Sequence, residues 1–255
     1  MFFITKETAP AGVGFSTFGT THLLWLLAFV LLCAVSIIFY RRLDATKKSI
    51  MIKIIGGSVL FLEILKNIVA IAVNDFGVGH LPFHLCGINV ILISFDIFKP
   101  TKIVCNFLYY LGIPGAILAL LFPNWTVLPC LNFFAIHSFV IHMLLVLYPL
   151  ILVTGGDIKP NIKAMPRCIL LLVIMAIPIY FLNLLWNTNF MFLMDPETGN
   201  PLELFEKYLG SHLWGFPILL PIVMFIMYIP MPIASLFGKK ENKDKKQEKE
   251  EVTVG

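Results

Sequence analysis

Residues 130–152 read CLNFFAIHSFVIHMLLVLYPLIL, a stretch that contains no Asp, Glu, Lys or Arg. An α-helix rises about 1.5 Å per residue, so about 20 apolar residues cross the hydrocarbon core of a bilayer. The stretch therefore predicts a membrane-spanning helix. Its two histidines, His137 and His142, raise the question of what polar groups do at that depth.

The composition of the whole chain agrees with a membrane location. Of 255 residues, 58% are hydrophobic and only 13% are charged, whereas a soluble domain carries about 25% charged residues. This is too little polar material to cover a water-facing surface. The five cysteines are spread singly and form no CxxC pair, so the sequence indicates neither a disulfide framework nor a zinc site of known spacing. The N-terminus does not have the pattern of a cleaved signal peptide.

Seven windows of the sequence are long and apolar enough to span a membrane. They are residues 20–40, 50–73, 81–98, 103–121, 130–152, 166–189 and 212–236. Short connections between most of them favour antiparallel neighbours in one bundle. No internal repeat is evident, so a duplicated transporter architecture is not indicated. We predict an all-α membrane protein, a seven-transmembrane-helix bundle.

The basic residues lie on alternate connections. They are concentrated in residues 41–53, 99–102 and 157–167 and in the C-terminal tail. The opposite side holds only Lys6 and Lys207. By the positive-inside rule, this distribution places the N-terminus outside the cell and the C-terminus in the cytoplasm. The four tryptophans, near the predicted outer ends of spans, fit an interfacial aromatic belt.

The predicted organisation has three parts. Residues 1–19 form an extracellular segment, residues 20–236 form the transmembrane domain, and residues 237–255 form a disordered, Lys/Glu-rich cytoplasmic tail. Residues 201–209, PLELFEKYL, alternate apolar and acidic residues at helical spacing. They fit either an amphipathic helix lying on the outer surface or a polar loop with a short surface helix.

Polar residues in four of the predicted spans share one depth. At 1.5 Å per residue, Cys86, Lys66 and His137 each lie about 8 to 10 Å below the outer ends of their spans. Because polar groups within a span usually face the protein interior or a wet cavity, we expect a polar cavity in the outer leaflet. Its other candidate members are Glu63, Asn67, His80, His84, Asn89, His142, Asn183 and, nearer the surface, Asn187.

Helical spacing refines this group. Glu63, Lys66 and Asn67 share one face, and the first two can form an ion pair that merely holds their span in the bundle. His80 and His84 share another face at i and i+4. His137 and His142 differ by about 140° around a helix, so only one of them is expected in the cavity.

Three chemistries fit such a cavity, and a non-catalytic structural or partner-binding protein is a fourth reading. The first is nucleophilic, with the Cys86 thiol activated by His137 as a base and outer-leaflet lipids as reactants. The second is a metal site on His80 and His84, although no HExxH motif accompanies them. The third is ligand binding or transport by Glu63, Lys66 and the asparagines. No cofactor and no nucleic-acid partner is indicated.

Three motifs carry a resemblance to a known family. They are LPFHLCGINV (81–90), NFFAIHSFVIH (132–142) and LLWNTNFMFL (184–193), the last followed by HLWGFP (212–217). Together they resemble the YwaF-like family of bacterial integral membrane proteins (TP0381-type), over nearly the whole chain. That family is distantly similar to eukaryotic multi-pass lipid acyltransferases and hydrolases of the transmembrane protein 164 group.

The resemblance implies lipid acyl chemistry, with Cys86 in the nucleophile position and His137 in the histidine position. It also implies a phospholipid or other lipid substrate and, for a bacterial family, the plasma membrane. The sequence departs from the eukaryotic acyltransferase around the cysteine, because it reads Leu85-Cys86-Gly87 where that enzyme has Asn-Pro-Cys-His.

Overall fold

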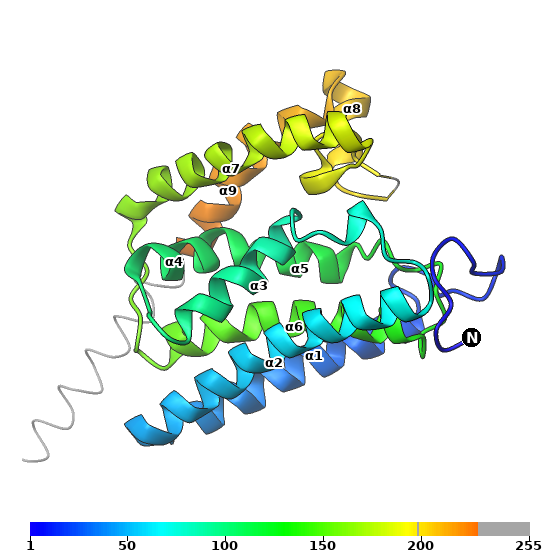
Figure 1. Cartoon of the computed structure of the whole chain (residues 1–255). Helices are drawn as coiled ribbons and strands as arrows, with labels where there is room; N and C mark the ends of the chain where they lie inside the picture. Colours follow the sequence, from blue (N-terminus) through cyan, green and yellow to red (C-terminus); the bar gives the residue numbers. More distant parts are fainter. Residues whose placement is uncertain (198, 229–255) are drawn as a thin grey trace, which may run out of the picture.

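The computed structural model describes residues 1–197 and 199–228 (Figure 1). Within these residues every regular element is a helix, which confirms the all-α prediction. In chain order the elements are α1 (Thr20–Arg41), α2 (Ala45–Ala72), η1 (Val78–His80), α3 (Leu85–Asp96), α4 (Lys102–Phe107), η2 (Leu108–Gly112), α5 (Ile113–Leu121), α6 (Phe133–Thr154), η3 (Ile162–Ala164), α7 (Met165–Trp186), η4 (Phe190–Phe192), α8 (Leu202–Leu209), η5 (His212–Trp214) and α9 (Gly215–Tyr228). The predicted tail, residues 237–255, lies outside the described residues.

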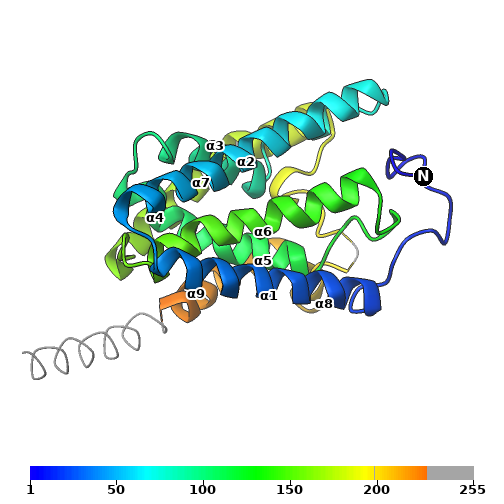
Figure 2. The same cartoon turned by 90° about the horizontal axis from the view of Figure 1, so that it is seen from below.

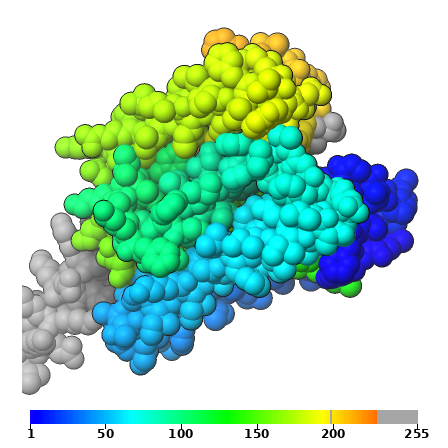
Figure 3. All heavy atoms as spheres, in the orientation of Figure 1, coloured from blue at the N-terminus to red at the C-terminus, as the bar shows by residue number. Residues whose placement is uncertain are grey.

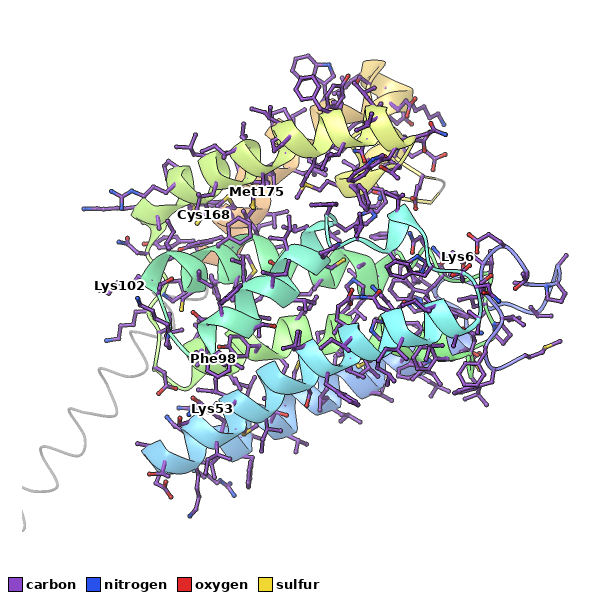
Figure 4. All side chains as sticks on the ribbon, in the orientation of Figure 1. Lys6, Lys53, Phe98, Lys102, Cys168 and Met175 are labelled. Carbon is purple, nitrogen blue, oxygen red and sulfur yellow. The ribbon has the colours of Figure 1, made fainter. Side chains whose placement is uncertain are left out.

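The long helices run back and forth between two ends of one bundle (Figures 1 and 2). We call the end that carries residues 1–19 the amino end; loops 73–84, 122–132 and 187–201 also lie there. The opposite, basic end carries loops 42–44, 97–101 and 155–161. Lys53 and Lys102 lie toward the basic end and Lys6 at the amino end (Figure 4). The predicted alternation of basic connections therefore corresponds to two physical ends.

The segment α4–η2–α5 and helix α6 form the centre of the bundle. Two thirds of the apolar window is buried in each of these two spans, against 17 to 22% in α1, α2 and α7. Helix α6 lies between α1 and α2 (Figure 2), while α7 and α9 both pack against η2. Large apolar side chains such as Val35, Phe61 and Leu185 are exposed on the outer helices. Exposed apolar faces on long helices are typical of a protein surrounded by lipid.

The number of spanning helices is less regular than predicted. Among the described residues, five helices are long and apolar enough to cross a membrane, or six if α8 and the η5–α9 segment, bent by 118°, form one broken span. Helix α3 has only 12 residues, about 18 Å of length, so it cannot cross the hydrocarbon core alone. The predicted span 212–236 is seen only to Tyr228, because residues 229–236 lie outside the described residues.

The start of α3 corrects the predicted span 81–98. The chain is extended at Leu81 and again at His84, so the helix begins at Leu85. Leu81 precedes Pro82, and a residue before proline is driven out of the helical region by contact with the proline ring. Gly56 brings α2 close to the other end of α3, because a Cβ at Gly56 would come within 2.3 Å of the Ile97 side chain.

The amino-terminal segment is fastened to the bundle by Asn132, the residue before α6. Its side-chain oxygen accepts hydrogen bonds from the backbone N–H groups of Phe134 and Ala135, and so caps the helix. Its side-chain nitrogen donates to the carbonyls of Met1 and Ile4, at 3.2 and 2.8 Å. On the face shown in Figure 3, this segment packs against the amino end beside α2.

Candidate functional site

The first turn of α3 presents Cys86. Since the helix begins at Leu85, Cys86 is its second residue, closer to the helix N-terminus than a helix beginning at Pro82 would place it. No backbone carbonyl within the described residues accepts a hydrogen bond from the N–H groups of Cys86 and Gly87, and both groups lie beside the thiol. Free N–H groups at a helix N-terminus attract negative charge. Burial and the Glu63 carboxylate oppose the anionic form of the thiol, and the Lys66 ammonium and these two N–H groups offset part of that cost.

An ion pair between Lys66 and Glu63 lies opposite this turn. Both side chains come from one face of α2, as predicted, and are only 21% and 15% exposed. Helix α2 packs against both α3 and α6 at this level. The Lys66 ammonium interacts electrostatically with Cys86, and also with three imidazoles, those of His84, His137 and His142. Lys66 is thus the common electrostatic neighbour of the thiol and the histidines.

The two histidines of α6 have different surroundings. His137 is buried, lies beside the Leu62 carbonyl of α2, and has no hydrogen-bond partner for its Nε2 atom within the described residues. His142 shares a hydrogen bond of 2.6 Å with the Ser138 carbonyl and stacks on Trp125. The ring of His137 is therefore the one with a buried nitrogen available for chemistry.

No hydrogen bond joins the Cys86 thiol to an imidazole within the part of the chain that the structure describes. His137 and Cys86 come from helices that pack against each other, α6 and α3. Electrostatically, Lys66 reaches both. A proton transfer between them would be made through a substrate or a water molecule rather than through an existing contact.

Two asparagine side chains have buried oxygen atoms that accept no hydrogen bond within the described residues. The side-chain oxygens of Asn67 on α2 and Asn89 on α3 have no hydrogen-bond partner within the described residues. Asn89 lies against Gly112, where a Cβ would come within 3.2 Å of the amide nitrogen. Gly112 ends the π-helical segment η2, and Pro114 beyond it lacks the N–H that would bond to Tyr110. Such π segments occur frequently at functional sites.

His80 and His84 do not share a helical face, which corrects the prediction. His80 ends the short turn η1 and lies 3.5 Å from the Asp75 carboxylate. His84 precedes α3, accepts a hydrogen bond from the Met191 N–H at 3.3 Å, and packs edge-on against Phe190. The described residues contain no group of three or more His, Cys, Asp or Glu side chains that could hold a metal ion.

Asn183 and Asn187 serve the turn after α7. Asn183 is buried, and its amide nitrogen donates to the Phe190 carbonyl at 3.0 Å. Its oxygen accepts from the Phe190 N–H and the Thr188 hydroxyl, at 2.8 and 2.9 Å. Asn187 is exposed and adopts a left-handed conformation as the C-cap of α7. Both side chains therefore shape the loop that meets His84, and none of these bonds reaches Cys86.

The amino end carries an acidic cluster that the sequence reading missed. A hollow of about 640 Å³ lies between the amino-terminal segment and loop 73–80, and its lining includes Glu7, Asp75 and His80. Burial, with the neighbouring Glu7 carboxylate as second cause, raises the pKa of Asp75. Hydrogen bonds lower the pKa of Glu7. These residues are far apart in sequence and belong to no motif, so only the docking of the segment reveals them. Cys86 is not part of this hollow.

One of three comparisons with known proteins found a match. The model of the TMEM164 family matches residues 17–228, which include every described helix from α1 to α9. A search of the curated proteins and a search of the solved structures each found no match.

Proposed function

The chain belongs to the TMEM164 family, and on that premise we propose that it is a multi-pass membrane protein that transfers or hydrolyses acyl groups of lipids through Cys86. The proposal joins the chemistry implied by the motifs to the surroundings of one thiol. It places the protein in the plasma membrane of a bacterium. The reactants would be lipids that enter the bundle from the surrounding leaflet.

One observation carries the proposal. At the junction of α2, α3 and α6, a thiol with free helix N–H groups and an unpartnered histidine nitrogen share one cationic neighbour, Lys66. A positive charge and free N–H groups support a cysteine nucleophile. They also suit the negative oxygen that develops when a nucleophile adds to an acyl carbonyl.

The reaction would proceed in two steps. In the first, His137 accepts the thiol proton, the Cys86 sulfur bonds to the acyl carbon, and the ester C–O bond breaks. The leaving lipid oxygen takes the proton from His137. In the second step, a hydroxyl group of an acceptor lipid gives its proton to His137 and attacks the thioester, and the proton returns to the sulfur as the C–S bond breaks. Water in place of the acceptor gives hydrolysis.

The decisive experiment compares the lipids of cells that express the wild-type protein with those of cells that express Cys86→Ser or His137→Gln. Both variants should abolish any change in the lipid profile that depends on the wild-type protein, while membrane expression stays the same. Cys130→Ser is the matched control, because Cys130 is also partly buried at the amino end but lies outside the junction. A protein-dependent change in the lipid profile that persists in Cys86→Ser would show that Cys86 is not the nucleophile and would refute the proposal.

A lipophilic thiol probe tests the role of the surroundings independently of the substrate. Labelling of Cys86 should be fast in the wild-type protein and at least tenfold slower in Lys66→Met. Labelling that is equally fast in both would remove Lys66 from the proposed activation of the thiol.

The proposed topology has seven crossings, with the N-terminus outside and the C-terminus in the cytoplasm. It is supported by the Lys and Arg residues in and beside loops 42–44, 97–101 and 155–161 at the basic end. Helix α3 would complete its crossing through the half-buried turn at residues 81–84. A membrane-impermeant reagent applied to intact cells should label a cysteine introduced at Thr8 and spare one introduced at Lys159. The reverse pattern would invert the topology.

A further inference from the structure

A second polar site lies at the basic end, away from Cys86. A hollow of about 430 Å³ opens between the ends of α1, α2, α3 and α6. The polar side chains that line it include Tyr40, Lys48, Lys53, Asp96, Tyr148 and Asp157. Lys53 and Lys66 are thirteen residues apart on α2, about 20 Å along the helix. The two sites are therefore separate, and the argument that follows does not depend on acyl chemistry.

The clearest sign of a ligand is the hydroxyl group of Tyr40. The residue is completely buried, and its hydroxyl lies beside the Asp157 carboxylate but makes no hydrogen bond of good geometry within the described residues. A buried polar group without a partner destabilises the folded protein. Because Tyr40 also lines the hollow, a bound molecule is the simplest partner for this group.

Two lysines and one carboxylate, that of Asp157, leave the same side of the hollow with a net positive charge. Lys48 is held between the Gly155 carbonyl at 3.3 Å and the Asp157 carboxylate at 3.6 Å, and its ammonium lies 4.9 Å from the centre of the Tyr40 ring. Lys53 forms no ion pair with any described carboxylate. Two ammonium groups and a free hydroxyl together offer the hydrogen-bond donors that a phosphate group needs.

The other side of the hollow offers an acceptor. Asp96 accepts hydrogen bonds from the Tyr148 hydroxyl at 3.0 Å and from the Thr101 N–H at 3.2 Å, and more weakly from the Cys105 thiol, 3.8 and 3.9 Å from its two oxygens. It forms no ion pair with a described Lys, Arg or His. An ionised carboxylate has room for about four hydrogen bonds. A ligand whose phosphate lies beside the lysines would therefore bind best if it also carries a hydrogen-bond donor that reaches Asp96.

We infer that this hollow binds the headgroup of a phospholipid that carries a hydrogen-bond donor beside its phosphate, as phosphatidylethanolamine does. The hollow lies where α1 ends and α2 begins, the level of the lipid headgroups for spans of this length. Basic pockets between transmembrane helices on the cytoplasmic side are known to hold the phosphates of anionic headgroups, and phosphatidylethanolamine presents the same phosphate group. The volume suits a headgroup but not a whole lipid.

Native mass spectrometry of the full-length protein tests the inference. The probes are phosphatidylethanolamine and phosphatidylcholine with identical acyl chains, since the choline headgroup has no N–H donor. The wild-type protein should retain the ethanolamine lipid about tenfold more tightly, the value of one charge-assisted hydrogen bond. Asp96→Asn should abolish this preference. Equal retention of the two lipids by the wild-type protein would overturn the inference.

Two further variants test the phosphate side. Tyr40→Phe and Lys53→Gln should each weaken retention of phosphatidylethanolamine by about fivefold to tenfold. Lys47→Gln is the matched control, because Lys47 is an exposed neighbour that pairs with Asp44 and does not line the hollow. It removes the same charge from the same end and should leave retention unchanged. Equal retention by Tyr40→Phe and the wild-type protein would contradict the role of the hydroxyl.

Thermal unfolding distinguishes a loss of lipid binding from a defect in folding. Without lipid, Tyr40→Phe should unfold at the same temperature as the wild-type protein or higher, because the Tyr40 hydroxyl makes no hydrogen bond of good geometry within the described residues. Added phosphatidylethanolamine should stabilise the wild-type protein more than this variant. Glycerophosphoethanolamine, which lacks the acyl chains, separates a lipid from a soluble phosphoester. If it stabilises the protein as strongly as the lipid does, the assignment to a lipid headgroup is wrong.

Discussion

Replacing Lys66 with methionine leaves the Glu63 carboxylate without its ion-pair partner at the junction of α2, α3 and α6. The two side chains form an ion pair and are only 21% and 15% exposed. Removing one partner of a fully buried ion pair costs about 3 to 5 kcal/mol, because the remaining charge is left desolvated. Partial exposure of both groups lowers this penalty, so we expect a loss of about 2 to 3 kcal/mol in the free energy of unfolding.

The double replacement Glu63→Met with Lys66→Met is the matched comparison. It removes both charges and keeps side chains of similar volume, and such replacements are often neutral or stabilising. We expect the double variant to stay within about 1 kcal/mol of the wild-type protein. Thermal unfolding of the purified proteins in one detergent, followed by intrinsic tryptophan fluorescence, measures all three. The double variant should nevertheless label Cys86 as slowly as Lys66→Met does, because it also lacks the ammonium.

Two results would refute this reasoning. If Lys66→Met unfolds at the wild-type temperature, Glu63 is not held in a desolvated site and the pair contributes nothing. If the double variant regains both stability and fast labelling, the pair only holds α2 in the bundle. That second result would establish the purely structural role of Glu63 and Lys66.

Two further predictions concern the loops at the amino end. Asn183→Ala removes three hydrogen bonds in the turn after α7, so we expect a loss of about 3 kcal/mol and faster hydrogen exchange at residues 187–193. Asn187→Gly, at an exposed left-handed position, should change neither quantity, and an equal effect of both replacements would contradict the assignment. The raised pKa of Asp75, whose ordinary value is 3.8, means that the folded protein retains a proton that the unfolded chain releases. Docking of the amino-terminal segment should therefore weaken as the pH rises through this raised value. Limited proteolysis of residues 1–9 measures this docking. The pH range lies above 4.5, where Glu7, with its lowered pKa, is ionised. Protection from cleavage should fall with rising pH in the wild-type protein but not in Asp75→Asn. An identical pH dependence in both would show that Asp75 does not control docking.

Hydropathy was sufficient to identify the helices of the bundle. Long apolar windows have few alternatives in a membrane, because every backbone group must be hydrogen-bonded within its own segment. The helices over 20–40, 103–121 and 130–152 therefore appear close to their predicted positions. The i, i+3 spacing of Glu63 and Lys66 likewise predicted their ion pair. These features depend on contacts that are local in the chain.

The arrangement of the site depended on contacts between distant segments. Hydropathy could not place the start of α3, although Pro82 contained a local signal, and the position of Cys86 beside free N–H groups depends on that start. The bonds that draw Asn183 into its own turn, and the packing of Tyr40 above Asp157 and Lys48, follow from how segments meet in space. Polar groups find partners according to three-dimensional proximity, whereas sequence spacing reports proximity only along a single helix. The sequence therefore determined a helical membrane protein with polar residues at a common depth, and the tertiary structure decided which of them meet.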